Sequence, residues 1–126
     1  MSTKKEKTAA ELFMAQALAK QLKQELKDNI LPYWINRMQD PERGFHGRID
    51  GHDRLDENAP KGAIMNARLL WTFASAYRLT KGSEEGKTYL EVAQRAKREI
   101  IDRFYDADFG GICWSLNPDG TPLDTK

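Results

Sequence analysis

An arginine inside an apolar segment is the residue of this sequence best suited to chemistry. Arg68 lies midway along residues 62–79, which are otherwise almost entirely apolar, and an unpaired charge is costly in such a place. Trp71 follows three residues later and therefore shares the face of Arg68 on a helix. A guanidinium can hold oxygen atoms, and an indole can stack on the apolar face of a ligand ring. We take these two residues as binding candidates, with Asn66 as a weaker third.

Each of these residues also has a purely structural interpretation. Arg68 can pair with a carboxylate from elsewhere in the fold, and core packing is the commoner role for a tryptophan in an apolar helix. Asn66 can equally cap a helix or form a hydrogen bond in the core.

The remaining ionisable residues give little support for catalysis. The only two histidines, His46 and His52, fall in one segment rich in glycine and proline. The acids of that segment do not match a calcium-binding loop, so we expect turn and cap roles for them and no metal site. These acids are Asp50, Asp53, Asp56 and Glu57.

Composition excludes several classes of protein. The 126 residues carry 20 Lys and Arg against 19 acids, a net charge of +1, which gives no broad footprint for nucleic acid or for an acidic membrane. Cys113 is the single cysteine, so an internal disulfide is impossible and a zinc site is not expected. No apolar leader or membrane-spanning stretch is evident, and we expect a cytoplasmic protein.

Three helices should position the candidate residues. Apolar residues recur at three- and four-residue steps over residues 8–38 and 84–105, which predicts two amphipathic helices, the first with Pro32 either kinking it or starting a separate last turn. Residues 62–79 leave almost no polar face, which predicts a helix buried on all sides.

Two segments with turn residues, 40–61 and 106–126, follow the outer helices and predict short hairpins. Asp119-Gly120 is a strong turn signal. The two segments resemble each other at a period of roughly 65–70 residues, which is typical of an array of helix pairs. An apolar helix in a three-helix chain has too few partners, so we expect a truncated chain.

Residues 44–50, 59–77 and 109–116 closely resemble cellobiose 2-epimerases, and Pro122-Leu123-Asp124 extends the likeness. The string Lys-Gly-x-Ile-x-Asn-x-Arg-x-x-Trp at residues 61–71 is more similar to these enzymes than to N-acylglucosamine 2-epimerases. The resemblance implies an all-α fold, an array of helix pairs with short β-hairpins that forms part of an (α/α)6 barrel. Residues 1–126 would then be the N-terminal portion of a single barrel domain.

The resemblance also implies an activity. The family inverts C2 of the reducing-end glucose of cellobiose-like β-1,4-disaccharides through an enediolate, without a cofactor. That reaction needs a base, an acid and a cation or donor beside the oxygens. Arg68 matches the substrate-binding arginine of the family. The acid and base histidines of the family lie on later helices, so we expect no catalytic residue here and an inactive chain by itself.

Other functions stay open at this point. The chain can be a relative of N-acylglucosamine 2-epimerases or of mannose isomerases, with loops beyond this sequence setting the substrate. A hydrolase or lyase of a related barrel would require a pair of acids on loops, which the sequence does not show convincingly. A non-catalytic helical interaction module would require that the chain cover its own apolar helix.

Overall fold

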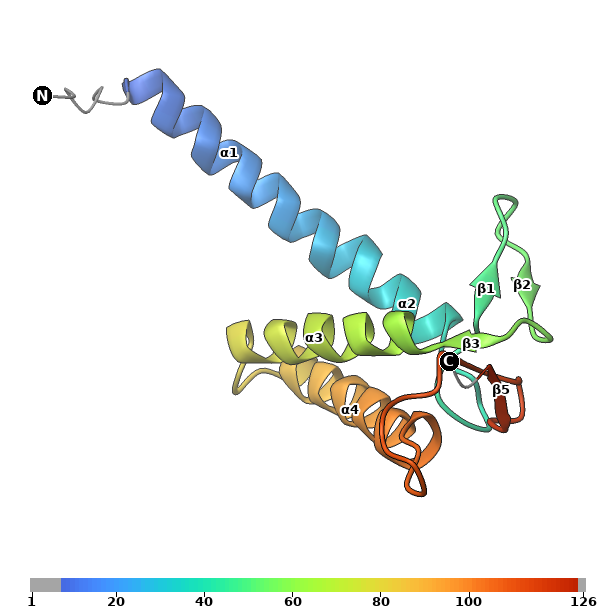
Figure 1. Ribbon diagram of the computed structural model, residues 1–126. Coiled ribbons are helices and arrows are strands. Elements are labelled where there is room, and N and C mark those ends of the chain that lie inside the picture. Colours follow the sequence, from blue (N-terminus) through green and yellow to red (C-terminus); the bar gives the residue numbers. More distant parts are fainter. Residues whose placement is uncertain (1–7, 125–126) are drawn as a thin grey trace, which may run out of the picture. The chain divides into compact units, whose positions relative to one another are not determined.

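The computed structural model describes residues 8–124, which are mainly helical with short antiparallel strands (Figure 1). They form two compact units, the first ending at Arg37 and the second beginning at Met38. The described part of the first unit is helical from Ala9 to Arg37, in agreement with the helix predicted over residues 8–38. It comprises α1 (Ala9–Glu25), the π-helical η1 (Leu26–Ile30) and α2 (Leu31–Arg37).

The start of this helical run follows from side-chain chemistry. The Thr8 hydroxyl accepts from the backbone N–H of Glu11, whose carboxylate accepts from the N–H of Thr8, a complete capping box. Pro32 falls in the first turn of α2, where its missing N–H is tolerated. The backbone N–H of Leu31 donates to the Leu26 carbonyl, the wider π-helical spacing. The backbone stays helical at both ends of this π-helical segment, so α2 continues the same helical run and the separate last turn is not seen.

All the strands found within residues 8–124 belong to the second unit. One hairpin pairs β1 (Arg48–Ile49) with β2 (Leu55–Asp56). A three-stranded antiparallel sheet has the order β3-β4-β5, formed by Lys61–Gly62, Ser115–Leu116 and Pro122–Asp124. Strand β3 is followed without a loop by a helix that begins at Ala63, so the sheet fixes the position of the start of that helix.

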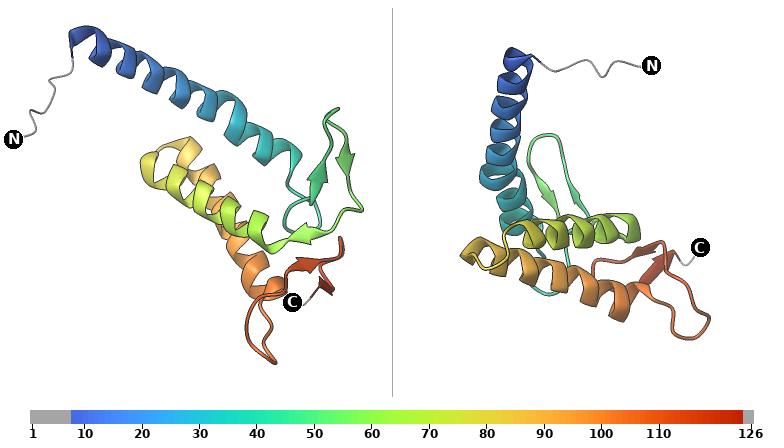
Figure 2. Two further views of the ribbon diagram at one scale, coloured as in Figure 1. Left: turned by 45° about the horizontal axis from the view of Figure 1, so that its top comes forward. Right: turned by 90° about the vertical axis from the view of Figure 1, so that its left-hand side faces the viewer.

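Two helices, α3 (Ala63–Leu79) and α4 (Glu84–Glu99), run side by side in this unit (Figures 1 and 2). The rings of Phe73 and Tyr89 meet with centroids 6.1 Å apart at 52°. Ser83 caps α4 by accepting from the N–H of Gly86. Apolar burial between the helices supplies the main stabilisation. The buried apolar residues of the pair are Leu69, Phe73, Ala76, Tyr89, Val92, Ala93 and Ala96.

The prediction that α3 is buried on all sides is wrong for the described residues. Leu69 and Phe73 on the α4 side are 5% and 0% exposed, whereas Ile64 and Trp71 on the opposite side are 49% and 73% exposed. The reason is geometric, because α4 packs against one side of α3 only. The expectation that this helix has too few partners is thereby confirmed within residues 8–124.

The structure shows the internal repeat as two hairpins 67 residues apart. The backbone N–H of Asp50 donates to Arg54 at 2.9 Å, and that of Asn117 donates to Thr121 at 2.7 Å. In each hairpin a residue with positive φ, Asp53 or Gly120, completes the turn. The offset agrees with the predicted period of 65–70 residues.

The helices before the two hairpins also match. α4 continues into a second π-helical segment, η2 (Ile100–Phe104), in which the N–H of Tyr105 donates to the Ile100 carbonyl at 2.9 Å. The two helical runs end at Arg37 and Phe104, again 67 residues apart. Each repeat is thus a long outer helix with one π-helical segment, followed by a hairpin.

Gly47 marks a close approach of two backbone segments. A Cβ added there would lie 1.9 Å from the Pro60 carbonyl oxygen, so Gly47→Ala forces the segments apart. We expect a loss of about 1–3 kcal/mol in unfolding free energy, measured by urea unfolding. Gly51→Ala is the matched control, because nothing lies within 4 Å of its added Cβ. Equal midpoints for the two variants would contradict the close approach.

Candidate functional site

A shallow groove of about 500 Å³ lies along the exposed face of α3. Helical spacing of three and four residues places its lining side chains on one face. Arg68 is the only charged member of the lining, which consists of Ile64, Ala67, Arg68, Trp71 and Thr72. The structure therefore brings Arg68 and Trp71 together, as the sequence predicts.

Arg68 is exposed and forms no ion pair with any of residues 8–124. The structural alternative, an arginine neutralised by a carboxylate, is therefore not seen in this part of the chain. A guanidinium that is always charged and presents five N–H donors is left available for a ligand's oxygens.

Trp71 exposes 73% of its surface beside Arg68. The core-packing alternative does not apply among the described residues, because the indole is on the face opposite Phe73. An exposed indole next to a guanidinium suits a ligand with an apolar ring face and polar edges.

Asn66 is not brought to the groove. It is 1% exposed and lies on the buried side of α3 with Leu69. Its side-chain amide donates to the Gly62 carbonyl at 2.9 Å, four residues earlier. This is the core hydrogen bond, one of the two structural alternatives that the sequence offered for Asn66. Successive residues of an α-helix are about 100° apart around its axis, so Asn66 lies about 200° from Arg68. This spacing already predicted from the sequence that the two side chains are on different faces.

Neither histidine lines the groove. The exposed His52 lies in the turn of the first hairpin, where its backbone N–H donates to Asp50 Oδ1 at 2.8 Å. Backbone hydrogen bonds from Arg54 and His52 lower the pKa of Asp50. Asp56 likewise accepts from the N–H of Asn58. The predicted turn roles of Asp50 and Asp56 are confirmed.

A buried ion pair escaped the sequence analysis. Lys61, 2% exposed, places Nζ 2.6 Å from Asp40 Oδ2, and the buried His46 has Nδ1 4.0 Å from the same oxygen. Lysine and aspartate 21 residues apart give no periodic pattern from which to predict the contact. The only hint of this buried contact in the sequence is that Lys61 stands beside a glycine in a strand-like segment.

Asp40 gives the fold an acid sensitivity. Burial raises the pKa of Asp40, but hydrogen bonds from Lys61 and from the N–H of Glu42 outweigh it, so the net pKa lies below the ordinary 3.8. A lowered folded-state pKa contributes stability that is complete above the unfolded-state pKa and is lost as pH falls through the folded-state value.

Asp40→Asn should therefore lose less stability than the parent between pH 7 and pH 3, measured by urea unfolding. Glu84→Gln, at an exposed pair, is the control. Identical acid losses in parent and Asp40→Asn would contradict the assignment.

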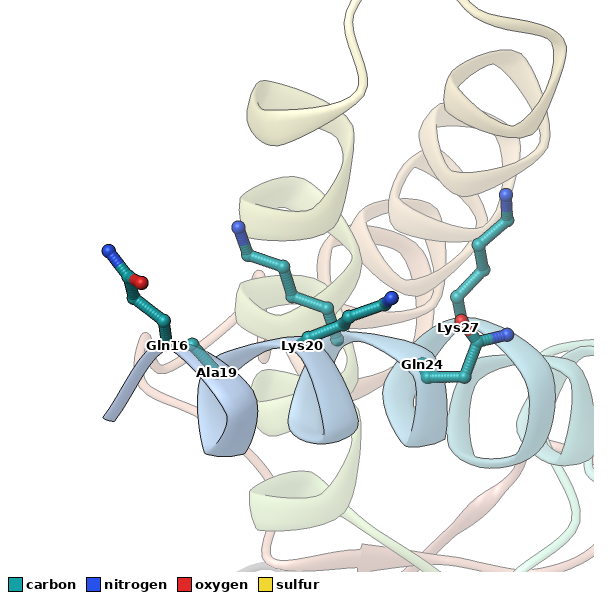
Figure 3. Close-up of a pocket in the computed structure, with 6 residues that line it drawn as sticks. Gln16, Ala19, Lys20, Gln24 and Lys27 are labelled. Atoms are coloured by element: carbon teal, nitrogen blue, oxygen red, sulfur yellow. The ribbon is translucent and has the colours of Figure 1, made fainter. Parts of the chain in front are cut away.

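Two other concave surfaces are lined mainly by residues with charged or amide side chains. One lies on α1 and is lined by Gln16, Ala19, Lys20, Lys23, Gln24 and Lys27 (Figure 3). The other combines Arg95, Arg98, Glu99 and neighbouring charges. Neither joins an aromatic ring to a charged group, so the α3 groove is the better candidate for a sugar.

The groove can bind but supplies no proton-transfer group of its own, because its lining contains no histidine and no carboxylate. Among residues 8–124 no three His, Cys, Asp or Glu side chains gather closely enough to hold a metal ion. Within the same range, no helix has the length and hydropathy needed to cross a membrane.

Comparison with known proteins gives specific similarities. A cellobiose 2-epimerase of Bacteroides fragilis is 55% identical over 114 residues, which are 90% of this chain and 28% of that protein. The solved cellobiose 2-epimerase of Spirochaeta thermophila DSM 6192 superposes with a TM-score of 0.80 at 39% identity, over 94% of this chain and 28% of that one. The chain thus spans less than a third of the length of these relatives.

A more distant likeness is to a solved D-mannose isomerase, with a TM-score of 0.60 at 27% identity over 75% of this chain and 23% of that one. No family model matches the chain. Solved cellobiose 2-epimerases are (α/α)6 barrels, and the helices and short hairpins of this chain superpose on part of one. The predicted fold class is confirmed.

Proposed function

We propose that this chain, which is homologous to the cellobiose 2-epimerases, is the N-terminal portion of a single-barrel sugar 2-epimerase and supplies part of its sugar-binding surface. The observation that carries the proposal is Arg68, which has no ion-pair partner among residues 8–124, beside the exposed Trp71. Both are on the helix that contains most of the family-like string of residues 61–71. The proposed substrate is a cellobiose-like disaccharide, and the proposed location is the cytoplasm.

The chemistry explains why an unpaired arginine belongs in such a site. Epimerisation at C2 starts from the ring-opened aldehyde of the reducing-end glucose, whose C2 proton a base removes. The resulting enediolate carries negative charge on its oxygens, and an acid returns a proton to the opposite face of C2. Arg68 would donate to those oxygens and stabilise the charge as it develops.

The two side chains would have different tasks. Trp71 would stack on an apolar sugar face and orient the substrate. The groove lining contains no base, and the family resemblance implies that histidines on later helices transfer the protons. The chain alone is therefore expected to bind sugar weakly and to leave its C2 configuration unchanged.

A chimera tests the proposal. In it, this chain replaces the matching 114-residue segment of the Bacteroides fragilis relative. With cellobiose in deuterated water, the chimera should form the C2 epimer, with deuterium at C2 of the reducing-end unit. Product and label are read by NMR, and the unaltered relative is the positive control. A folded chimera that leaves cellobiose unchanged would overturn the proposal.

The likeness to a D-mannose isomerase supports a second candidate, a ketose-forming isomerase. An enediolate that is reprotonated at C1 gives a ketose, and one reprotonated at C2 gives the epimer. The same NMR spectra therefore separate the two activities. A fructose unit as the main product from cellobiose or free mannose would favour the isomerase.

A further inference from the structure

The buried Lys61–Asp40 ion pair lies at the N-terminal end of α3, the helix that contains Arg68. Lys61 belongs to β3 and directly precedes Gly62, the N-cap of α3. Its Nζ donates to Asp40 Oδ2 at 2.6 Å and to the Arg43 carbonyl at 2.9 Å. Lysines are almost never this buried without a partner, so the contact is specific.

The acceptor of this pair is itself held in place. Asp40 Oδ1 accepts from the N–H of Glu42 at 3.0 Å, and the N–H of Asp40 donates to Gly44 at 3.1 Å. Arg95 of α4 donates to the carbonyls of both Asp40 and Gly44. The backbone of the residue that Lys61 reaches is therefore anchored to α4.

The start of α3 has no side-chain cap of its own. Its N-cap is Gly62, and the N–H of Ala63 donates to the Trp114 carbonyl at 3.0 Å. The first turn is held by the neighbouring strand and by the Lys61 contact. Arg68 lies in the second turn, so a shift or rotation of the helix start is transmitted to its guanidinium.

We propose that the Lys61–Asp40 ion pair positions the first two turns of α3, and through them Arg68, for sugar binding, an inference that rests on the proposed function. Stability alone does not explain such a pair. An apolar or neutral replacement of both partners is often neutral or stabilising, whereas removal of one partner leaves a buried charge uncompensated. Lys61 and Asp40 are positioning residues and need not touch the sugar.

The test separates stability from position with a double variant. Lys61→Met should lower the melting temperature of the chain, and adding Asp40→Asn should restore it because no charge is then left unpaired. In the double variant, the backbone amides of residues 67–69 should still exchange about tenfold faster than in the parent. The amides of residues 75–77 should exchange at the parent's rate. Lys61→Arg, which keeps the charge, should exchange as the parent does. The control is Lys87→Met, at an exposed pair with Glu84.

The chimera provides the second measurement. There the double variant should lower kcat/KM for cellobiose about tenfold, while Lys87→Met leaves it unchanged. Parent-like exchange at residues 67–69 or parent-like kcat/KM in the double variant overturns the inference. If the unsubstituted chimera is folded but inactive, the proposed function fails, and the exchange data on the chain still decide whether the pair positions α3.

Discussion

Replacing Arg68 by methionine in the chimera is expected to lower kcat/KM for cellobiose about 10²–10³-fold, the usual cost of removing one donor to a developing oxyanion. Arg68→Lys should lie between parent and methionine, because it keeps the charge and loses the planar fork. Initial rates of C2 epimerisation measure both variants.

The matched control is on the same helix. Arg78→Met removes an exposed arginine from the last turn of α3, outside the groove lining, and should leave kcat/KM unchanged. A parent-like rate in Arg68→Met, or an equal loss in both variants, would show that Arg68 has no special role at the reacting oxygens.

Phe73→Ala should lower the unfolding free energy of the chain by about 3–5 kcal/mol, because it empties a fully buried site between α3 and α4. Phe73 is 0% exposed and its ring meets that of Tyr89. Urea unfolding followed by circular dichroism measures the loss.

Trp71→Ala provides the contrast two residues away. Trp71 is 73% exposed on the other face of α3, so its removal should change stability by less than about 0.5 kcal/mol. In the chimera the same variant should raise KM for cellobiose. A large stability loss on replacing Trp71, or a small one on replacing Phe73, would contradict the two-faced description of α3.

Periodicity predicted the helices well because each makes a local pattern. The apolar steps over residues 8–38 and 84–105 correspond to helical runs in the structure. Glycine and turn residues likewise predicted the hairpins, since Asp119-Gly120 supplies the left-handed residue that the turn needs. The π-helical segments could not be predicted, because nothing in the local pattern distinguishes them from an α-helix.

The candidate site was predicted in part. Arg68 stands out as a charge in an apolar segment, and spacing alone places Trp71 beside it. Helical spacing was sufficient to show that Asn66 does not share the face of Arg68. The Lys61–Asp40 contact, in contrast, depends on tertiary structure that no short window of sequence contains. Full burial of α3 was inferred from composition, which cannot say how many neighbours a helix has.

The pairing of β3 with β4 bears on the order in which the chain folds. Lys61 opposes Leu116, and the whole α3–α4 pair lies between them in the sequence. Closing so long a loop without intervening structure is entropically unfavourable, and contacts distant in sequence form slowly. Once α3 and α4 have docked, the ends of the loop are already close. The three-stranded sheet is therefore expected to form after the helix pair, as a late event that joins one repeat to the next.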